Sequence, residues 1–384
     1  MHCNDALLLR SISLYSGKYY LKMAVQEQAL LAALASVKDI YTGEDIVVSK
    51  RVQGLQIDGD HVTLKVVMPY PAKSLEAGLR AAIEAAAKQV GATNVDISFE
   101  LKVIAHAVQQ GVQLLPQVRN IIAVASGKGG VGKSTTAVNL ALALVQEGAR
   151  VGILDADIYG PSQPMMLGVQ QRPESDDGKT MQPVENHGIQ AMSIGFLVKQ
   201  DEAMVWRGPM AVQALEQMLR QTNWHDLDYL IIDMPPGTGD IQLTLSQRVP
   251  LTGAVIVSTP QDIALLDARK GIRMFEKVGV PILGMVENMA AHICSQCGHT
   301  EHIFGEDGGK RLATEIGIDY LGALPLDMQI RLQADGGAPT VVADPDGKVA
   351  RLYRGIALQV AAKVAKRSKD YSHKFPSITI SKAT

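Results

Sequence analysis

Two different periods of apolar residues in the first part of the chain predict a small α+β domain. Apolar residues at helical spacing predict a first helix with Leu30, Leu31, Leu34 and Val37 and a second with Leu79, Ile83, Ala86 and Val90. Residues 62–68, between the two helices, and residues 95–99, after the second, predict strands. We expect residues 46–55 and 56–68 to pair as a hairpin that turns near Asp58-Gly59-Asp60, because Asp and Gly accept the backbone angles of tight turns. We assign residues 23–103 to this domain.

Continuous apolar runs alternate with helical stripes in the longer second part, over residues 119–368. The runs lie at residues 121–125, 151–154, 229–232, 254–257 and 282–286. Strands without a polar face are buried on both sides, so the pattern predicts an α/β domain in which helices cover both faces of a parallel sheet. Ligands of such sheets bind beyond the carboxyl ends of the strands.

Three further segments complete the predicted organisation. Residues 104–118, which include Gly111 and Pro116, are predicted to form a linker between the two domains. Residues 1–22 match neither a signal peptide nor a transit peptide well, and we expect a disordered extension or a mis-assigned start with Met23 as the true first residue. Residues 369–384 form a C-terminal tail.

The composition is typical of a folded soluble protein and excludes several kinds of partner. The chain is 47% hydrophobic and 20% charged, and its formal net charge of −2 leaves no broad basic surface for nucleic acid or an anionic membrane. Three cysteines, Cys3, Cys294 and Cys297, are too few for a disulfide framework and fit a reducing compartment. No apolar run approaches the roughly 20 residues that span a bilayer. We therefore expect a cytoplasmic protein.

The stretch Gly127-Lys128-Gly129-Gly130-Val131-Gly132-Lys133-Ser134-Thr135 lies between a strand pattern and a helix pattern. The spacing G-x-x-x-x-G-K-S lets backbone N–H groups surround phosphates at a helix N-terminus. Lys133 then reaches the outer phosphates, and Ser134 supplies an oxygen for Mg²⁺. The order strand, loop, helix is the context that this motif requires, so the stretch predicts a nucleoside triphosphate site.

Carboxylates follow two of the predicted strands directly. Asp155 and Asp157 come after residues 151–154, and Asp233 follows residues 229–232. Beside a P-loop, such groups orient a hydrated Mg²⁺ or a nucleophilic water. A single Asp at a strand end is a turn or cap residue about as often as it is a functional residue. Three of them beside a P-loop favour a functional role. We assign Asp233 to the water shell of Mg²⁺, Asp157 to positioning the attacking water, and Asp155 to supporting the first switch loop.

Lys128 is a second lysine inside a P-loop that needs only one. Its side chain cannot easily reach phosphates that its own loop surrounds, so we expect it either to be solvated or to act on a nucleotide held by a partner chain. Residues 128–135 resemble the deviant Walker A motif of MinD/ParA-type and nitrogenase iron protein-type ATPases. In that family the early lysine crosses a dimer interface, so the resemblance implies a homodimer in which Lys128 acts in trans.

Cys294 and Cys297 form a C-x-x-C motif that can hold one soft metal centre from a tight turn, which Gly298 eases. A redox pair is an alternative, although no thioredoxin-like unit surrounds the motif. A local zinc site with His299 and His302 is another, although zinc motifs usually separate the two pairs by about a dozen residues. A [4Fe–4S] cluster prefers four thiolates. Two copies of the chain related by a two-fold axis would supply them.

Together these motifs resemble those of the Mrp/ApbC family of iron–sulfur cluster carrier ATPases, from Met23 to nearly the end of the chain. The resemblance is carried by residues 127–135, 155–162 and 233–240, by Glu287-Asn288-Met289, and by Cys294-x-x-Cys297. It implies that the small domain is a metal–sulfur cluster assembly domain and that Asn288 recognises the adenine base. It further implies that Phe304-Gly305 and Gly308-Gly309 support the cysteine turn. The leader before Met23 departs from the family pattern.

The function implied by this resemblance is that of an ATP-hydrolysing homodimer. It would hold a [4Fe–4S] cluster between two Cys294/Cys297 pairs, receive it from cluster donors and transfer it to apo-proteins. The alternative is a MinD/ParA-like positioning ATPase that attaches to a membrane or DNA, with a structural zinc or no metal at the cysteines. Membrane attachment would need an amphipathic terminal helix such as residues 349–366, but its apolar positions predict packing on the core instead: Leu352, Ile356, Val360 and Val364. We therefore expect neither membrane nor nucleic acid as a partner.

Overall fold

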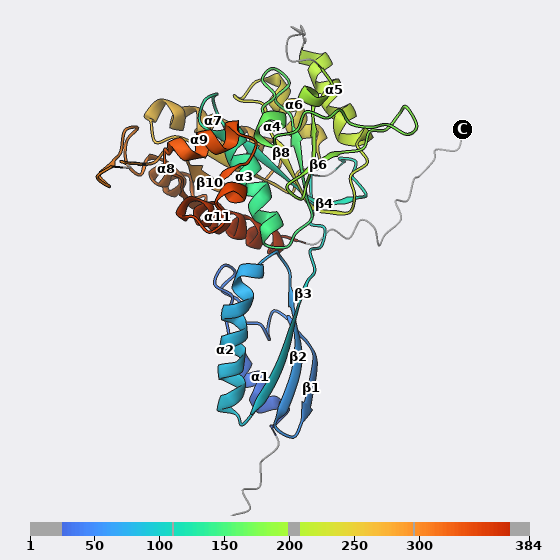
Figure 1. The fold of residues 1–384 in the computed structure, drawn as a ribbon, viewed down its shortest axis with the longest axis vertical. Helices are drawn as coiled ribbons and strands as arrows, with labels where there is room; N and C mark the ends of the chain where they lie inside the picture. The colour runs from blue at the N-terminus through green and yellow to red at the C-terminus, as the bar shows by residue number, and fades with distance from the viewer. Residues whose placement is uncertain (1–24, 110, 199–207, 295, 369–384) are drawn as a thin grey trace, which may run out of the picture.

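The computed structural model describes residues 25–109, 111–198, 208–294 and 296–368 (Figure 1). The predicted extension 1–22, the tail 369–384 and Cys3 lie outside these residues. A three-stranded sheet with two helices precedes an eight-stranded sheet with helices on both faces. The predicted fold class, a small α+β domain followed by an α/β domain, is confirmed.

The small domain packs two helices on one three-stranded sheet in the order β1-β2-β3. Its elements are α1 (Glu27–Leu34), β1 (Val52–Asp58), β2 (His61–Met68), α2 (Glu76–Gln89) and β3 (Asn94–Leu101). β1 and β2 form the predicted antiparallel hairpin, and β3 runs parallel to β2. Burial alternates along β2, so that Val62, Leu64 and Val66 share a core with Leu79 and Ile83 of α2.

The hairpin begins later than the apolar pattern predicts. Residues 46–50 form turns rather than a strand. Asp45 Oδ1 accepts hydrogen bonds from the N–H groups of Val47 at 3.0 Å and Val48 at 2.7 Å. A side chain that binds neighbouring N–H groups withdraws them from a strand ladder, and the strand therefore starts at Val52.

The sheet of the large domain has the strand order β13-β10-β9-β4-β8-β5-β7-β6. Its strands are β4 (Val118–Ala125), β5 (Val151–Asp155), β6 (Val184–Asn186), β7 (Ile189–Ser193), β8 (Leu227–Asp233), β9 (Gly253–Ser258), β10 (Ile282–Glu287) and β13 (Tyr320–Ala323). Neighbouring strands run parallel, except that β6 is antiparallel to β7 at the edge. The sequence pattern does not predict β6, β7 and β13, because polar residues interrupt β6 and β7 and the four-residue β13 is too short to be recognised.

Helices cover both faces of this sheet. They are α3 (Lys133–Gln146), α4 (Gln163–Met166), α5 (Gly208–Gln221), α6 (Asp240–Arg248), α7 (Asp262–Lys277), α8 (Gly308–Ile316), α9 (Met328–Asp335), α10 (Thr340–Ala343) and α11 (Lys348–Ala365). Ile122 and Val124 share a core with α3 and α11, whereas Ile121 and Ala123 share a core with α5 and α7. Successive residues of a buried strand point to opposite faces, so β4 has no polar side.

The apolar stripe of α11 packs in the core beside α3, as predicted. Ile356, Val360 and Val364 are buried, but the prediction for Leu352 is wrong because this side chain is 44% exposed. Tyr353 fills the buried position instead, since a stripe with 3.6 residues per turn shifts around the helix. None of the helices in the described ranges is long and apolar enough to cross a membrane.

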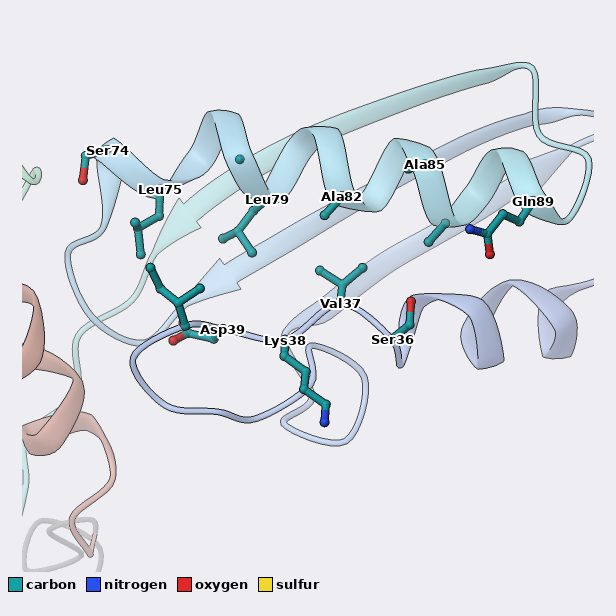
Figure 2. Close-up of a pocket in the computed structure, with 13 residues that line it drawn as sticks. Ser36, Val37, Lys38, Asp39, Ser74, Leu75, Leu79, Ala82, Ala85 and Gln89 are labelled. Carbon is teal, nitrogen blue, oxygen red and sulfur yellow. The ribbon is translucent and has the colours of Figure 1, made fainter.

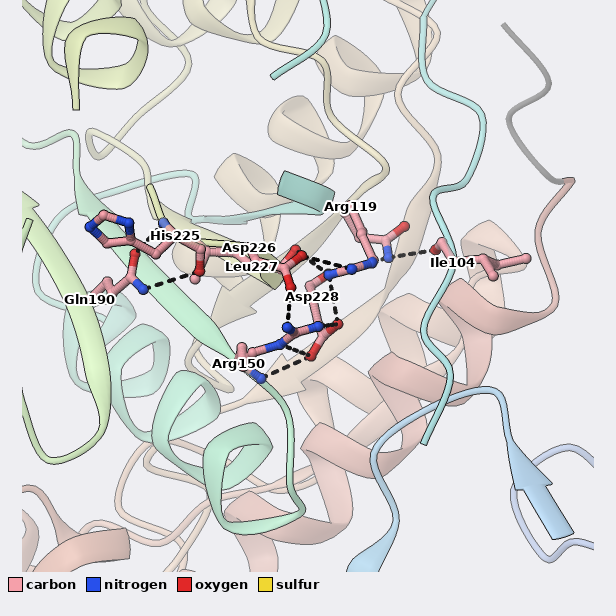
Figure 3. A network of polar contacts seen from close by, with 9 residues as sticks. Ile104, Arg119, Arg150, Gln190, His225, Asp226, Leu227 and Asp228 are labelled. Carbon is pink, nitrogen blue, oxygen red and sulfur yellow. Dashed lines mark hydrogen bonds and ion pairs between the residues drawn. The ribbon is translucent and has the colours of Figure 1, made fainter. Parts of the chain in front are cut away.

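An ion-pair network joins the amino ends of β4, β5 and β8 (Figure 3). The buried Asp228 of β8 accepts hydrogen bonds from Arg119 of β4 and from Arg150, which directly precedes β5, both at 3.1 Å. Arg119 also pairs with the exposed Asp226 at 2.7 Å. The opposite ends of these three strands lead into the P-loop, Asp155 and Asp233. The network therefore fixes the relative positions of the three strands whose opposite ends form the candidate site.

Glu147, directly after α3, holds the small domain against the large one. It is 3% exposed, and its Oε2 accepts a hydrogen bond at 2.8 Å from the N–H of Ser74, just before α2. The N–H of Lys73 donates to the Glu147 carbonyl oxygen at 3.3 Å. At the end of α11, Lys366 Nζ donates to the carbonyl oxygen of Thr42. The helix that begins at the P-loop thus ends at the domain junction.

Candidate nucleotide site and cysteine hairpin

The P-loop runs from the end of β4 to the start of α3 and depends on glycine at two close approaches. A Cβ atom at Gly127 would lie 2.1 Å from the main chain of Asp267 in α7. A Cβ atom at Gly132 would lie 2.0 Å from Asn288 Nδ2, and the φ angle of Gly132 is +81°. Glycine accepts this left-handed conformation without strain. Neighbouring elements therefore enclose the loop tightly enough to fix its path.

Three hydrogen bonds hold the loop, one within it and two to the segments that follow β8 and β10. Ser126 Oγ donates to the carbonyl oxygen of Lys128 at 2.9 Å, and the Ser126 carbonyl oxygen accepts from the N–H of Gly237 at 3.1 Å. Asn288, which directly follows β10, donates from Nδ2 to the Val131 carbonyl oxygen at 2.9 Å. Asn288 therefore contacts the P-loop itself, and its role in adenine recognition stays a prediction.

Lys133 and Ser134 meet Asp233 at the carboxyl ends of β4 and β8. Lys133 Nζ pairs with Asp233 Oδ1 and lies 3.2 Å from Ser134 Oγ. A hydroxyl and a carboxylate oxygen thus already converge on one positive charge. Mg²⁺ prefers such hard oxygen ligands, so the two side chains assigned to it fit the ion.

Asp155 is fully buried at the end of β5 and organises the loop that follows. Its Oδ2 accepts hydrogen bonds from the N–H groups of Ser162 and Gln163, both at 3.0 Å, and from Ser193 Oγ at 3.1 Å. Burial, together with the negative charge of Asp233, raises the pKa of Asp155 to about 7. Asp155 thus holds the loop after β5, and the function of this loop as a switch stays a prediction.

Asp157 lies in the same loop and is half-buried. Burial raises its pKa, and the charges of Lys133 and Asp233 act on it too, so it faces the same charged cluster. Its Oδ1 accepts a hydrogen bond from the N–H of Gly160 at 3.3 Å. Lys128 is also half-buried, and its ammonium group forms no ion pair within the described ranges. The catalytic roles of both residues stay predictions.

Sequence analysis missed Gln163, the first residue of α4. Its side chain is 1% exposed, and Nε2 donates to Asp233 Oδ2 at 2.8 Å and to the Ser134 carbonyl oxygen at 3.2 Å. Glutamine belongs to none of the motifs that identify such sites. The available signal was its position in the loop after β5, beside the assigned aspartates.

Cys294 and Cys297 lie on a tight hairpin between β11 (His292–Ile293) and β12 (Thr300–Glu301). The N–H of Cys294 donates to the His299 carbonyl oxygen, and the N–H of Gly298 donates to the Cys294 carbonyl oxygen, both at 2.9 Å. Cys297 is exposed and Cys294 is partly exposed. Hydrogen bonds from the N–H groups of Cys297 and Gln296 lower the pKa of Cys294, which favours the thiolate that binds metals.

Within the described ranges, the histidines near this hairpin are not arranged with the cysteines around one metal position. His302 Nδ1 lies 2.9 Å from the Ala290 carbonyl oxygen. Across the part of the chain that the structure describes, no three His, Cys, Asp or Glu side chains are arranged to hold a metal ion. In this arrangement, one chain therefore offers a metal centre at the hairpin two ligands, the thiols of Cys294 and Cys297.

Gly308 and Gly309 let α8 approach the strand ends that carry the hairpin. A Cβ atom at Gly308 would lie 2.4 Å from the Pro260 carbonyl oxygen, and the N–H of Gly309 donates to Glu287 Oε2 at 2.5 Å. Burial raises the pKa of Glu287, the last residue of β10. The segment after the cysteines is thus anchored beside Asn288, and its role in supporting the cysteine turn stays a prediction.

A cavity of about 560 Å³ in the small domain is separate from this site (Figure 2). Leu79 and Ala82 of α2 and Leu75, directly before it, line one side, and residues 36–40 line the other. Asp39 at its edge is held by Arg51 and by the Tyr70 hydroxyl, both at 2.6 Å. None of the assigned nucleotide or cysteine residues lines it.

Comparison with known proteins matches both parts of the chain. The profile of a family described as NUBPL iron-transfer P-loop NTPase matches residues 117–361, and that of an iron–sulfur cluster assembly protein family matches residues 27–99. An iron–sulfur cluster carrier protein from Pseudomonas fragi is 59% identical over 270 residues, which cover 70% of this chain and 94% of that protein. An iron–sulfur cluster carrier protein from Escherichia coli K12 is 63% identical over 248 residues, covering 64% of this chain and 67% of that protein.

A solved structure shares the architecture of the large domain. It is a nucleotide-binding protein from Archaeoglobus fulgidus in complex with ADP, 38% identical to this chain with a TM-score of 0.53. The match covers 60% of this chain and 90% of that one.

Proposed function

Because the chain belongs to the family of NUBPL iron-transfer P-loop NTPases, we propose that it is an ATP-dependent iron–sulfur cluster carrier that transfers a [4Fe–4S] cluster to apo-proteins. The observation that carries the proposal is the contact between Asn288 and the Val131 carbonyl oxygen. It joins the nucleotide loop directly to the segment that leads into the hairpin of Cys294 and Cys297. A change in the P-loop can therefore reach the cluster-binding turn through one hydrogen bond.

ATP hydrolysis is assigned to the side chains around the P-loop. The N–H groups of residues 127–135 hold the phosphates, and Lys133 moves from Asp233 to the outer phosphates. Ser134 and Asp233 would hold Mg²⁺, which when bound would neutralise charge on the phosphates. Asp157 orients a water whose oxygen attacks the γ-phosphorus, while the bond to the β–γ bridging oxygen breaks and ADP leaves. The products are ADP and inorganic phosphate.

The cluster is the cargo, and two chains are needed to hold it. Each chain offers the two thiols of Cys294 and Cys297, and a [4Fe–4S] cluster prefers four thiolate ligands. A symmetric dimer places the same patch of both chains face to face. Ile293 and Ile303 beside the hairpin are 58% and 54% exposed, which gives such a dimer apolar surface to bury. Lys128, which lacks an ion-pair partner in the described ranges, would contact the partner's nucleotide.

Nucleotide and cluster would be coupled through two arrangements of this dimer. A ligand shifts an equilibrium only by its difference in affinity for the two states. ATP that contacts both P-loops through Lys128 favours the arrangement in which the chains are close. Hydrolysis removes the γ-phosphate contacts and releases that preference. The distance between the two cysteine hairpins would then differ between the two arrangements, and cluster donors would bind one arrangement and apo-proteins the other.

Anaerobic reconstitution tests the proposal. The native chain should take up close to four iron atoms per dimer, show the visible absorbance of a cluster, and transfer it to an apo-acceptor faster with ATP than without. Cys294→Ala/Cys297→Ala should lose the iron while it keeps nucleotide affinity, and Lys133→Ala should keep the iron and lose the ATP effect. Full iron content in the double cysteine variant would overturn the carrier function. Zinc without cluster absorbance in anaerobically purified protein would favour the structural zinc site instead.

A further inference from the structure

Gln163 connects the loop after β5 to the end of β8 and to the P-loop. Its Nε2 donates to Asp233 Oδ2 at 2.8 Å and to the carbonyl oxygen of Ser134 at 3.2 Å. Both partners are acceptors, so the amide nitrogen, and not the amide oxygen, has to face them. The chemistry of the neighbours therefore determines the orientation of this side chain.

The main chain of Gln163 is held just as firmly by the other buried aspartate. Its N–H donates to Asp155 Oδ2 at 3.0 Å. Asp155 and Asp233 are register partners on the neighbouring strands β5 and β8. One residue thus bridges the two carboxylates, with its backbone on Asp155 and its side chain on Asp233.

Two buried polar atoms in this loop have no hydrogen-bond partner within the described ranges. They are Gln163 Oε1 and Ser162 Oγ. Leaving a buried polar atom unpaired costs free energy, so the loop would gain from an arrangement that pairs them. The loop is therefore suited to shift when donors arrive at the site, while Gln163 Nε2 keeps it in contact with Asp233.

The need for Gln163 arises when Lys133 changes partners. In the described structure the Asp233 carboxylate accepts from two side chains, Lys133 and Gln163. Once Lys133 contacts phosphate oxygens, Gln163 is the side chain that remains on Asp233. Without it, the carboxylate assigned to Mg²⁺ would lose its orientation at the step that uses it.

We propose that Gln163 is a positioning residue of the ATPase site, which holds the Asp233 carboxylate while Lys133 binds the nucleotide. It acts through Asp233 and couples the loop after β5 to that carboxylate. The inference rests on the proposed ATP hydrolysis and adds to it a residue outside the P-loop and the assigned aspartates.

Gln163→Leu tests this role, because leucine has a similar size and removes both the donor and the unpaired oxygen. A hydrogen bond to a charged group is worth about tenfold or more in an equilibrium constant. We expect the Mg²⁺ concentration for half-maximal hydrolysis to rise about tenfold and kcat to fall, with KM for ATP changed less than about threefold. Binding of a fluorescent ADP analogue should weaken in Mg²⁺ and stay unchanged in EDTA.

Gln163→Glu keeps the shape of the side chain and tests the donor itself. The introduced carboxyl group donates to Asp233 only while it is protonated, so kcat of this variant should fall with rising pH relative to the native chain. Gln359→Leu is the matched control. Gln359 also donates to a main-chain carbonyl oxygen, that of Leu321 at 2.8 Å, but from α11. Loss of this hydrogen bond should lower the free energy of unfolding and leave the Mg²⁺ dependence of ATP hydrolysis unchanged.

The outcomes separate the two proposals. A Gln163→Leu variant with a lower Tm but native kcat and Mg²⁺ dependence would show a structural role and overturn the inference. If that variant does not fold, a native pH profile of Gln163→Glu overturns it equally. A native chain that binds ATP but does not hydrolyse it would instead overturn the proposed ATPase activity.

Discussion

Lys133 and Asp233 form an ion pair inside the protein, between the first residue of α3 and the last residue of β8. Their side chains are 6% and 0% exposed. The pair joins the P-loop to a carboxylate a hundred residues further along the chain. Nucleotide binding has to break this ion pair, because Lys133 Nζ cannot contact Asp233 and the phosphate oxygens at the same time.

Lys133→Ala should abolish ATP hydrolysis and also destabilise the fold. Removing one partner of a buried ion pair leaves an uncompensated charge, which costs about 3 kcal/mol or more in the free energy of unfolding. Phosphate release and urea denaturation measure the two effects.

Two controls show whether the pair itself is responsible. Lys133→Ala/Asp233→Asn should regain part of the lost stability, because it removes the uncompensated carboxylate. Arg331→Ala removes an exposed pair with Asp335 and should change the free energy of unfolding by less than about 1 kcal/mol. Native stability of Lys133→Ala would contradict the expectation.

Gly132→Ala should lose nucleotide binding and stability together. The methyl group would meet Asn288 Nδ2 at 2.0 Å, in a backbone conformation with φ at +81° that L side chains rarely adopt. We expect a loss of about 1–3 kcal/mol in the free energy of unfolding. Gly355→Ala in α11 meets no atom within 4 Å and has no positive φ, so it should stabilise slightly. Equal effects of the two substitutions would show that the P-loop is looser than described.

Glu147→Ala should loosen the small domain without unfolding the large one. The substitution removes the buried acceptor of the Ser74 N–H at the domain junction, and such a hydrogen bond contributes about 0.5–1.5 kcal/mol. Limited proteolysis should then cut the predicted linker, residues 104–118, faster than in the native chain. Glu315→Ala, which removes a surface partner of Arg269, is the control and should leave the cleavage rate as it is. Unchanged cleavage in both variants would mean that other contacts hold the junction.

Asp155 predicts a pH dependence of stability. Its pKa is about 7 in the folded chain, whereas its ordinary value is 3.8. The folded chain therefore keeps this proton over a pH range in which the unfolded chain has released it, and stability from this group falls as pH rises from about 4 to about 7. Asp155→Asn does not titrate, so the native chain should lose stability relative to this variant over that range. Denaturation curves at several pH values measure the difference, and a constant difference would exclude the assigned proton.

Local patterns were sufficient for much of the fold because period and turn chemistry act over short stretches. Strands β4, β5, β8, β9 and β10 of the large domain, the helical stripe of α2 and the hairpin turn near Gly59 follow from neighbouring residues alone. Local competition also explains the failures. Asp45 captures the N–H groups of Val47 and Val48, and the stripe of α11 turns past Leu352 to Tyr353.

The sequence by itself determined the kind of chemistry, since the P-loop motif, the aspartates after β5 and β8, and the C-x-x-C motif each depend on residue types at short spacing. Only the tertiary structure decided how these parts meet. Asn288 on the Val131 carbonyl oxygen, Gln163 on Asp233 and Glu147 at the domain junction join segments from different strands and domains. A hydrogen bond between distant segments depends on strand order and packing, and these leave no period or spacing in the sequence.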